Sequence, residues 1–199
     1  MTLPSIDQDY MLDFLTALLN TPSPTGFTEA AIEYTEQALQ AFPEVICSRT
    51  RKGGLLVKWI GEHDDHPRAL TAHVDTLGAM VKEIKGNGRL KLTKLGGYAW
   101  NTVEGEGVTV FTSDGNQVRG SLLLCKSSSH VHGAATNETK RDDDAMEVRL
   151  DAITHNAEDT KALGIQVGVF VAFDPRVEVT NGFIRSRHLD DKACVANLV

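Results

Sequence analysis

The chain has 199 residues, of which 41% are hydrophobic and 24% charged, so it can bury a core as one large domain or two small ones. The 20 basic and 27 acidic side chains leave a net charge of -7 without a long basic run, which argues against a nucleic-acid partner. No apolar stretch approaches the ~20 residues that span a bilayer, and the start lacks a signal-peptide pattern, so we expect no membrane partner and a cytoplasmic location.

Two amphipathic helices are predicted at the start of the chain. Apolar residues from Tyr10 to Leu19 recur at the three-and-four spacing of one helical face, and a second such pattern covers residues 28–42. The break between them is the proline-rich segment TPSPTG, residues 21–26. Strands are then expected at residues 55–60 and 68–75. This order of elements indicates an α/β layer.

After Gly78 the pattern changes to short β-rich runs separated by glycine or asparagine. The expected strands cover residues 80–84, 90–95, 107–112, 117–125, 146–153, 167–173 and 183–189. Residues 126–144 are almost wholly polar and predict a mobile loop, whereas residues 157–164 predict one short helix. A last helix begins at Asp190. The β-rich middle therefore predicts a small barrel or sandwich.

Four polar residues at the ends of predicted strands are hard to explain by packing. His73 and Asp75 are two apart on a strand and so share one face, and Asp190 and Asp191 open the last helix. Each pair also has an ordinary structural explanation, as a surface pair or as a helix cap. Imidazole and carboxylate groups suit zinc, cobalt or manganese, and a carboxylate can bridge two ions. Asp75 could hold the second ring nitrogen of His73, as metal-ligating histidines require.

We interpret the other clusters of possible metal-binding residues as exposed to solvent. The turn GEHDDHP, residues 61–67, is rich in histidine and aspartate, but it separates two strands and we interpret it as a solvated loop. His130 and His132 lie in the polar segment, where exposure is expected. The three cysteines are odd in number and widely spaced, which favours reduced core thiols over a disulfide framework.

Three blocks of this sequence resemble a known enzyme family. They are AHVDTLGAMV, GIQVGVFVAFDP and NGFIRSRHLDDKACVANLV, and they resemble blocks of the dinuclear metallo-aminopeptidases of the tetrahedral-aminopeptidase type, which include glutamyl aminopeptidases. In that family a catalytic α/β domain is interrupted by a β-rich domain of PDZ-like or small-barrel type. The resemblance thus implies an α/β/α catalytic domain, incomplete here, formed by residues 1–77 and 185–199, with the insert at residues 78–184.

The resemblance also implies roles for individual residues. His73 would bind one of two divalent metal ions, Asp190 would bridge both, and Asp75 would orient His73. Zinc is the first choice of metal, with cobalt and manganese as alternatives. The peptide bond between Asp190 and Asp191 would be cis. Family members are roughly twice as long as this chain, and the general-base glutamate and remaining ligands would lie in the other part. We therefore expect this chain to bind metal weakly and to show no turnover.

The sequence thus predicts part of a metal-dependent aminopeptidase that removes N-terminal residues from peptides and forms a homo-oligomer when full length. One alternative is a co-catalytic zinc deacylase acting on N-acyl amino acids. The other is a non-catalytic fragment, or an assembly and peptide-binding module built around the insert. An incomplete catalytic sheet also predicts exposed apolar surface on the last helix, at Val195, Leu198 and Val199.

Overall fold

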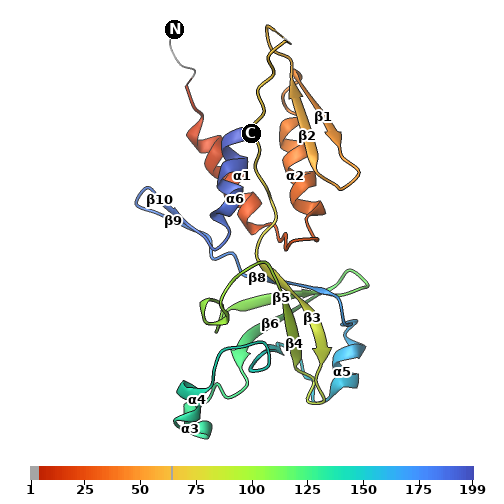
Figure 1. Ribbon diagram of the computed structural model, residues 1–199, viewed down its shortest axis with the longest axis vertical. Helices are drawn as coiled ribbons and strands as arrows, with labels where there is room; N and C mark the ends of the chain where they lie inside the picture. Colours follow the sequence, from red (N-terminus) through yellow and green to blue (C-terminus); the bar gives the residue numbers. More distant parts are fainter. Residues whose placement is uncertain (1–4, 64) are drawn as a thin grey trace. The chain divides into compact units, whose positions relative to one another are not determined.

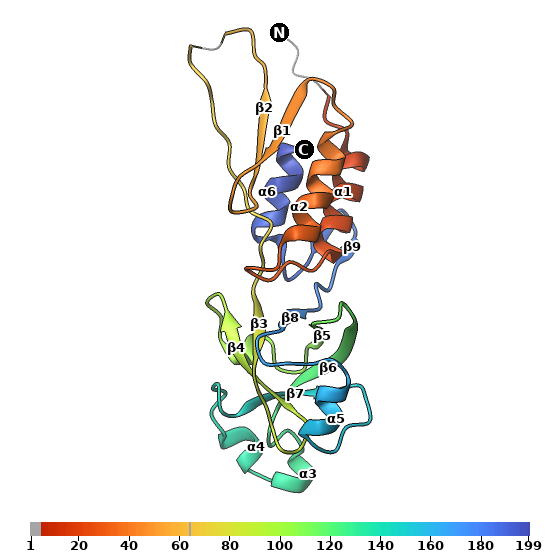
Figure 2. The same cartoon turned by 90° about the vertical axis from the view of Figure 1, so that its right-hand side faces the viewer.

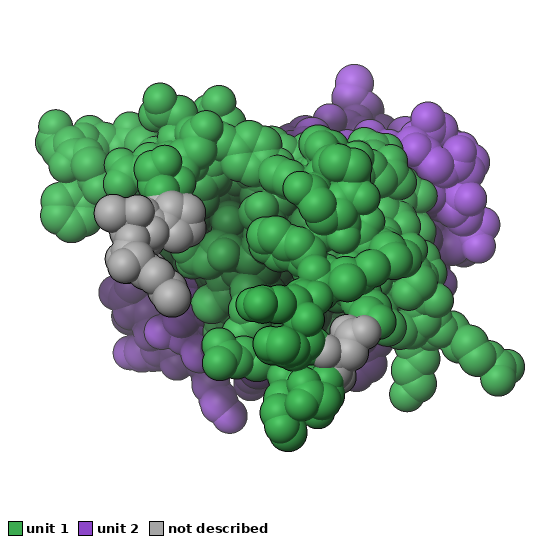
Figure 3. Space-filling view, turned by 90° about the horizontal axis from the view of Figure 1, so that it is seen from above, with its two compact units in different colours: residues 1–76, 175–199 green, residues 77–174 purple. Residues whose placement is uncertain are grey.

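The chain forms two compact units in a computed structural model that describes residues 5–63 and 65–199 (Figure 1). Unit 1 consists of residues 1–76 and 175–199, and unit 2 of residues 77–174; Figure 3 colours them green and purple. Residues 175–184, which the sequence analysis placed in the insert, therefore group with unit 1. Among the described residues, no helix has the length and apolar character needed to cross a membrane.

Three helices supply most of the core of unit 1: α1 (Gln8–Asn20), α2 (Glu29–Leu39) and α6 (Leu189–Leu198). The first begins where the Asp7 side chain accepts a hydrogen bond from the backbone N–H of Tyr10, which satisfies a donor that the helix itself leaves open. Helices α1 and α6 lie side by side (Figures 1 and 2). The core residues are Phe14, Leu15, Leu18, Leu19, Ala31, Val74, Val195 and Ala196.

Both predicted N-terminal helices are confirmed, but the expected exposure of the last helix is only partly correct. Val195 is buried at 6% exposure, because α6 packs against α1. Leu198 near the end of the helix is 43% exposed. The prediction of an exposed Val195 is therefore wrong.

Unit 1 contains a two-stranded antiparallel sheet of β1 (Val45–Arg49) and β2 (Leu55–Trp59). The sequence analysis predicted the second strand and missed the first. The predicted strand at residues 68–75 is extended, but its neighbourhood shows only an isolated parallel bridge between Pro24 and Thr76. A strand needs a ladder of backbone partners, and none of the described strands pairs with this segment.

A short hairpin precedes α6. It joins β9 (Glu178–Thr180) to β10 (Phe183–Arg185) through Asn181 and Gly182, whose φ angles are 51° and 79°. Asn-Gly is the residue pair that a tight hairpin turn with two positive φ angles prefers. The predicted strand at residues 183–189 is therefore shortened to three residues, and its hairpin partner was missed although the Asn-Gly signal was present.

Unit 2 is a closed barrel of six antiparallel strands in the order β3-β4-β7-β6-β5-β8. Of the two architectures expected for the β-rich region, the strands form the small barrel. Their bounds are β3 (Gly78–Ile84), β4 (Leu90–Leu95), β5 (Gly107–Phe111), β6 (Gln117–Leu124), β7 (Met146–Leu150) and β8 (Phe170–Phe173). The predicted short helix is confirmed as α5 (Ala157–Ala162), with Asn156 as its N-cap, and η1 (Trp100–Thr102) is one turn of 3-10 helix.

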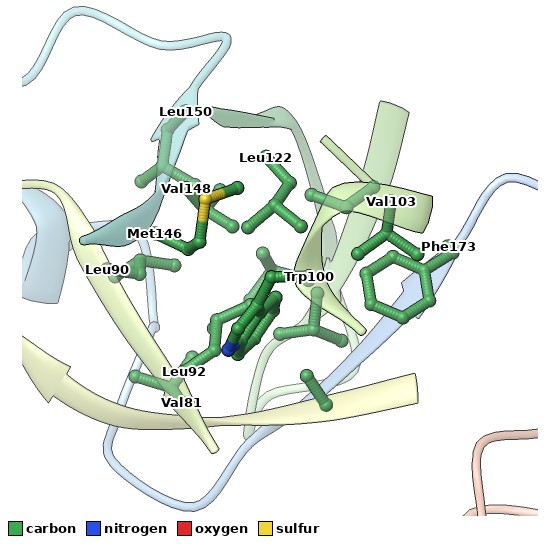
Figure 4. Close-up of a cluster of buried hydrophobic side chains, with 14 of the residues drawn as sticks. Val81, Leu90, Leu92, Trp100, Val103, Leu122, Met146, Val148, Leu150 and Phe173 are labelled. Carbon is green, nitrogen blue, oxygen red and sulfur yellow. The ribbon is translucent and has the colours of Figure 1, made fainter. Parts of the chain in front are cut away.

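The barrel is filled by apolar side chains around Trp100 (Figure 4). Trp100 is 2% exposed, and its indole N–H donates to Asp143 over 2.6 Å, so the polar end of the ring is satisfied. The strands contribute alternate residues to this interior. Those with 1% exposure or less include Val81, Leu90, Leu92, Val108, Leu122 and Val148.

The polar segment at residues 126–144 contains regular structure that the sequence analysis did not predict. It contains two one-turn helices, α3 (Ser129–His132) and α4 (Ala135–Glu138). Arg141 donates to the carbonyls of Thr136 and Thr139, both at 2.9 Å, and pairs with the Glu104 carboxylate at 2.8 Å. One guanidinium thus ties the segment to itself and to Glu104, while the mobility expected of this loop stays a prediction.

Candidate functional site

His73 and Asp190 come together in unit 1 although they are distant in sequence. His73 lies on the extended segment that follows the β1–β2 sheet, and Asp190 lies at the start of α6. The imidazole Nε2 of His73 is 3.4 Å from Oδ1 of Asp190. The side chains of His73 and Asp190 are 53% and 95% exposed, so the imidazole and the carboxylate are both open to solvent.

Asp75 holds the other nitrogen of the same imidazole. Nδ1 of His73 is 3.0 Å from Oδ1 of Asp75 and 3.1 Å from its backbone carbonyl oxygen. Both of these neighbours are acceptors, so in the neutral tautomer that carries its proton on Nδ1 the ring donates to Asp75 and Nε2 is the lone-pair nitrogen. The hydroxyl of Thr25 in turn donates to Oδ2 of Asp75 over 2.6 Å. This chain of contacts directs the free nitrogen of His73 toward Asp190.

Asp191 links the start of α6 to the backbone of the histidine segment. Its carboxylate accepts a hydrogen bond from the backbone N–H of His73 over 3.2 Å. The pKa of Asp191 is lowered, first by a hydrogen bond from the Cys194 thiol and then by the His73 amide and imidazole, against an opposing effect of partial burial. Cys194 is exposed, so the expectation of a core thiol is wrong for this cysteine. The Asp190–Asp191 peptide bond is cis, as the resemblance implied.

The proline-rich segment at residues 21–26 positions the histidine segment. The buried hydroxyl of Ser23 donates to the Val74 carbonyl over 2.7 Å, and the Ser23 carbonyl accepts from the Thr76 amide over 2.8 Å. The Thr25 amide then donates to the Thr76 carbonyl over 3.1 Å. Because these contacts alternate along both segments, they fix the register of His73 and Asp75 without a sheet.

Lys192 connects the same proline-rich segment to α6. Its side chain is fully buried, and Nζ donates to the carbonyls of Leu18 at 2.8 Å and Thr21 at 2.7 Å, at the end of α1. Burial lowers the pKa of Lys192 to about 8. The sequence analysis did not select this residue, because a lysine after two aspartates resembles an exposed helix start. The apolar residues that follow it were the available signal.

His73 Nε2 and Asp190 Oδ1 have the separation expected of two neighbouring ligands of one metal ion. Donor atoms at about 2.0–2.1 Å around a tetrahedral zinc ion lie about 3.3 Å from each other, close to the separation of His73 Nε2 and Asp190 Oδ1. Within the described part of the chain, no group of three or more His, Cys, Asp or Glu side chains is arranged to hold a metal ion. The residues present therefore supply a pair of donors and an orienting carboxylate.

The other groups rich in histidine and aspartate are exposed to solvent. In the turn at residues 61–67, His63, Asp65 and His66 are exposed, and Asp64 lies outside the described residues. His130 and His132 are exposed on α3. These positions agree with the prediction that both groups face solvent.

Comparison with known proteins identifies the family of this sequence. Residues 53–199 match the family model described as M42 glutamyl aminopeptidase. YhfE of Bacillus subtilis, which has a provisional aminopeptidase name, is 48% identical over 189 residues, covering 94% of this chain and 54% of YhfE. SgcX of Escherichia coli, also provisionally named an aminopeptidase, is 30% identical over 153 residues, covering 75% of this chain and 40% of SgcX. The chain thus spans about half the length of the curated relatives it matches.

Solved structures share the fold. An aminopeptidase from the archaeon Desulfurococcus kamchatkensis superposes with a TM-score of 0.80 at 21% identity, covering 94% of this chain and 49% of that one. The TET1 peptidase of Pyrococcus horikoshii, described as assembling into a tetrahedron or a large octahedral shell, has a TM-score of 0.76 at 23% identity. The match covers 94% of this chain and 54% of the TET1 chain. At these identities the likeness shows the fold alone.

Proposed function

Since the chain belongs to the M42 glutamyl aminopeptidase family, we propose that it forms part of a metal-dependent aminopeptidase that removes N-terminal residues from peptides. The observation that carries this proposal is the contact between His73 Nε2 and Asp190 Oδ1, with the opposite ring nitrogen held by Asp75. A histidine oriented by a carboxylate and facing a second carboxylate is a typical beginning of a metal site. We assign the catalytic domain to residues 1–77 and 185–199.

The proposed roles follow from the donor atoms. His73 would hold one of two divalent ions through Nε2, and Asp190 would be a ligand shared by both. Asp75 keeps the proton on Nδ1 and thereby fixes the ring, while Thr25 fixes Asp75 through its 2.6 Å hydrogen bond. When bound, zinc, cobalt or manganese would polarise the scissile carbonyl and lower the pKa of a bound water toward ~7. The general base and further ligands come from outside this chain.

The proposal includes assembly and location. The shells described for the Pyrococcus horikoshii TET1 peptidase support a homo-oligomer for the full-length protein. A cytoplasmic peptide-processing role agrees with the acidic composition and with the bacterial relatives. The chain alone would bind metal weakly, because it offers fewer than the three protein ligands of a catalytic zinc site.

The test joins this chain to the remainder of YhfE, meaning the part of YhfE that this chain does not match. The joined protein should contain zinc or cobalt by mass spectrometry and should hydrolyse amino-acyl anilides. Asp190→Asn should reduce both metal content and kcat/KM, the latter at least about a hundredfold, or about 3 kcal/mol. Asp191→Asn is the matched control and should have a smaller effect. Cleavage of N-acetyl amino acids instead of anilides would support the deacylase alternative.

A further inference from the structure

Asp190 is held in place by neither packing nor helical hydrogen bonding. Its side chain is 95% exposed, so packing does not fix the carboxylate. Its backbone, with φ -85° and ψ 109°, is not helical although it lies within the bounds of α6. A metal ligand nevertheless needs a fixed place, because coordination distances vary by only about 0.2 Å. The support for Asp190 therefore has to come from residues close to it in the sequence.

Lys192, two residues after Asp190, anchors this part of α6 to α1. Its side chain is fully buried, and Nζ donates to the carbonyls of Leu18 at 2.8 Å and Thr21 at 2.7 Å. These carbonyls lie at the C-terminal end of α1, where helix carbonyls lack intrahelical partners and the helix dipole favours a cation. The last turn of α1 has no basic side chain of its own. Helix α6 thus supplies the cation that the end of α1 lacks.

The support of His73 begins at the same place. Thr21 is the first residue of the proline-rich segment, and two hydroxyls of that segment hold the histidine segment. They belong to Ser23, which donates over 2.7 Å, and Thr25, which donates over 2.6 Å. Lys192 therefore joins the support of the imidazole to the support of the carboxylate that faces it.

We propose that Lys192 is a positioning residue that sets the separation of His73 Nε2 and Asp190 Oδ1, and thereby the affinity of this pair for a divalent ion. The two atoms are 3.4 Å apart. A buried charge is unfavourable unless it is hydrogen-bonded, so an ammonium in this core is retained for the two carbonyls that it joins. The inference rests on the proposed function, because the affected property is metal affinity. Its first test nevertheless needs no metal.

Two variants on the same helix separate positioning from packing. Lys192→Met keeps an unbranched side chain of similar length but cannot donate to the two carbonyls. Val195→Ala is the matched control, because Val195 is 6% exposed and its truncation weakens the same core without removing either hydrogen bond. Both variants should lower the midpoint of denaturant unfolding. Only Lys192→Met should displace Asp190 from His73.

Nuclear magnetic resonance of the metal-free chain is the first measurement. Nuclear Overhauser contacts between the ring protons of His73 and the β-protons of Asp190 should be present in the wild type and in Val195→Ala. They should be lost in Lys192→Met. Contacts that survive unchanged in Lys192→Met would overturn the inference, and this result is independent of whether the protein is an aminopeptidase.

Metal affinity is the second measurement. The protein that joins this chain to the remainder of YhfE is stripped of metal with a chelator and titrated with Co²⁺. Lys192→Met should raise the dissociation constant for Co²⁺ at least tenfold, as the loss of groups that orient metal ligands typically does, and Val195→Ala less than twofold. If the wild type binds no Co²⁺, the proposed function fails and the resonance measurement still decides the role of Lys192. If the wild type and Lys192→Met bind Co²⁺ equally tightly, the positioning role alone is wrong.

Lys192→Arg replaces Lys192→Met if the methionine variant does not fold. It keeps a cation with several N–H donors, but its group is larger and planar, and the fully buried site has to shift the start of α6 to accept it. The contacts between His73 and Asp190 should weaken and the dissociation constant for Co²⁺ should rise together. Wild-type values of both in a folded Lys192→Arg variant would overturn the inference.

Discussion

Unit 1 and unit 2 contain similar apolar strands but bury them to very different extents. Leu122 and Leu124 on β6 are 0% exposed inside the barrel, whereas Leu56 and Trp59 on β2 are 61% and 75% exposed. The difference lies in closure. The barrel pairs each of its six strands on both sides within residues 77–174, while β1 and β2 of unit 1 pair only with each other in the described part of the chain. An apolar strand sequence therefore predicts burial only where the chain supplies the neighbours.

The same contrast appears in how polar groups are satisfied. In the barrel, buried Glu147 pairs with Arg89 and with Lys85, the latter at 2.6 Å. In unit 1, the extended segment that carries His73 is held by the serine and threonine contacts of residues 23–25 instead of a β-ladder. Unit 2 is thus complete in itself, and unit 1 relies on local substitutes for sheet pairing.

The largest expected effect tests burial directly. Leu122→Ala should lower the free energy of unfolding of unit 2 by about 2–5 kcal/mol, because it leaves a cavity in a closed core. Leu56→Ala should change the stability of unit 1 by less than about 0.5 kcal/mol, because the side chain is already in water. Denaturant unfolding in a Trp59→Phe background, followed by Trp100 fluorescence, measures unit 2. Equal losses of unfolding free energy for Leu122→Ala and Leu56→Ala would contradict the contrast between the units.

A second prediction tests how tightly the barrel strands approach each other. A Cβ added at Gly120 would lie 2.7 Å from the Arg149 carbonyl oxygen and 2.9 Å from Val148. Gly120→Ala should therefore cost about 1–3 kcal/mol through strand displacement. Gly86→Ala is the control, because its added Cβ meets no heavy atom within 4 Å. An unchanged unfolding midpoint for Gly120→Ala would show that the strands can separate at little cost.

A third prediction concerns the hydrogen bonds of residues 23–25, which hold the segment that carries His73 in place of sheet pairing. Ser23→Ala removes the 2.7 Å hydrogen bond to the Val74 carbonyl and leaves a buried acceptor. The stability of unit 1 should fall by about 1–2 kcal/mol, and the amides of residues 73–76 should exchange faster. Ser48→Ala is the control, because its hydroxyl makes only an exposed 3.5 Å contact with the Leu56 carbonyl. Identical exchange in both variants would mean that Ser23 does not hold the segment.

How far the sequence predicts the fold depends on whether the signal is local. Helices α1, α2 and α5 and most barrel strands follow from periodicity and from turn residues, which need no knowledge of distant partners. The strand predicted at residues 68–75 has the right composition, but pairing depends on neighbours that no local pattern reports. Strand β1 was missed because Cys47, Ser48 and Arg49 interrupt its apolar character.

The candidate site was partly predictable for the same reason. His73, Asp75 and Asp190 stand at the ends of predicted strands, where packing did not explain them, and the structure brings these three together. Lys192 and Ser23 were missed, because their importance comes from burial. For Lys192 the available signal was the apolar residues that follow it, and these do not show that the lysine itself is buried beside the carbonyls of Leu18 and Thr21.

The smallest expected effect uses pH to compare the barrel with unit 1. The phenol of Tyr98 donates to the Gly78 carbonyl over 2.9 Å, and its pKa is raised well above its ordinary value, first by burial and then by the nearby Asp143 carboxylate. The unfolded phenol ionises near pH 10, so above that pH the folded state holds the extra proton and the free energy of unfolding falls.

At pH 7, Tyr98→Phe should lower the free energy of unfolding of unit 2 by about 0.5–1.5 kcal/mol through the lost hydrogen bond. Above pH 10 this difference should narrow by about 1.4 kcal/mol per pH unit, because phenylalanine cannot ionise. Tyr10→Phe is the control, since Tyr10 is 39% exposed in unit 1 and should leave the unit 2 transition unchanged. Parallel stability curves for the wild type and Tyr98→Phe from pH 7 to 11 would show that the phenol ionises inside the folded barrel, and that the closed unit is open to water at this point.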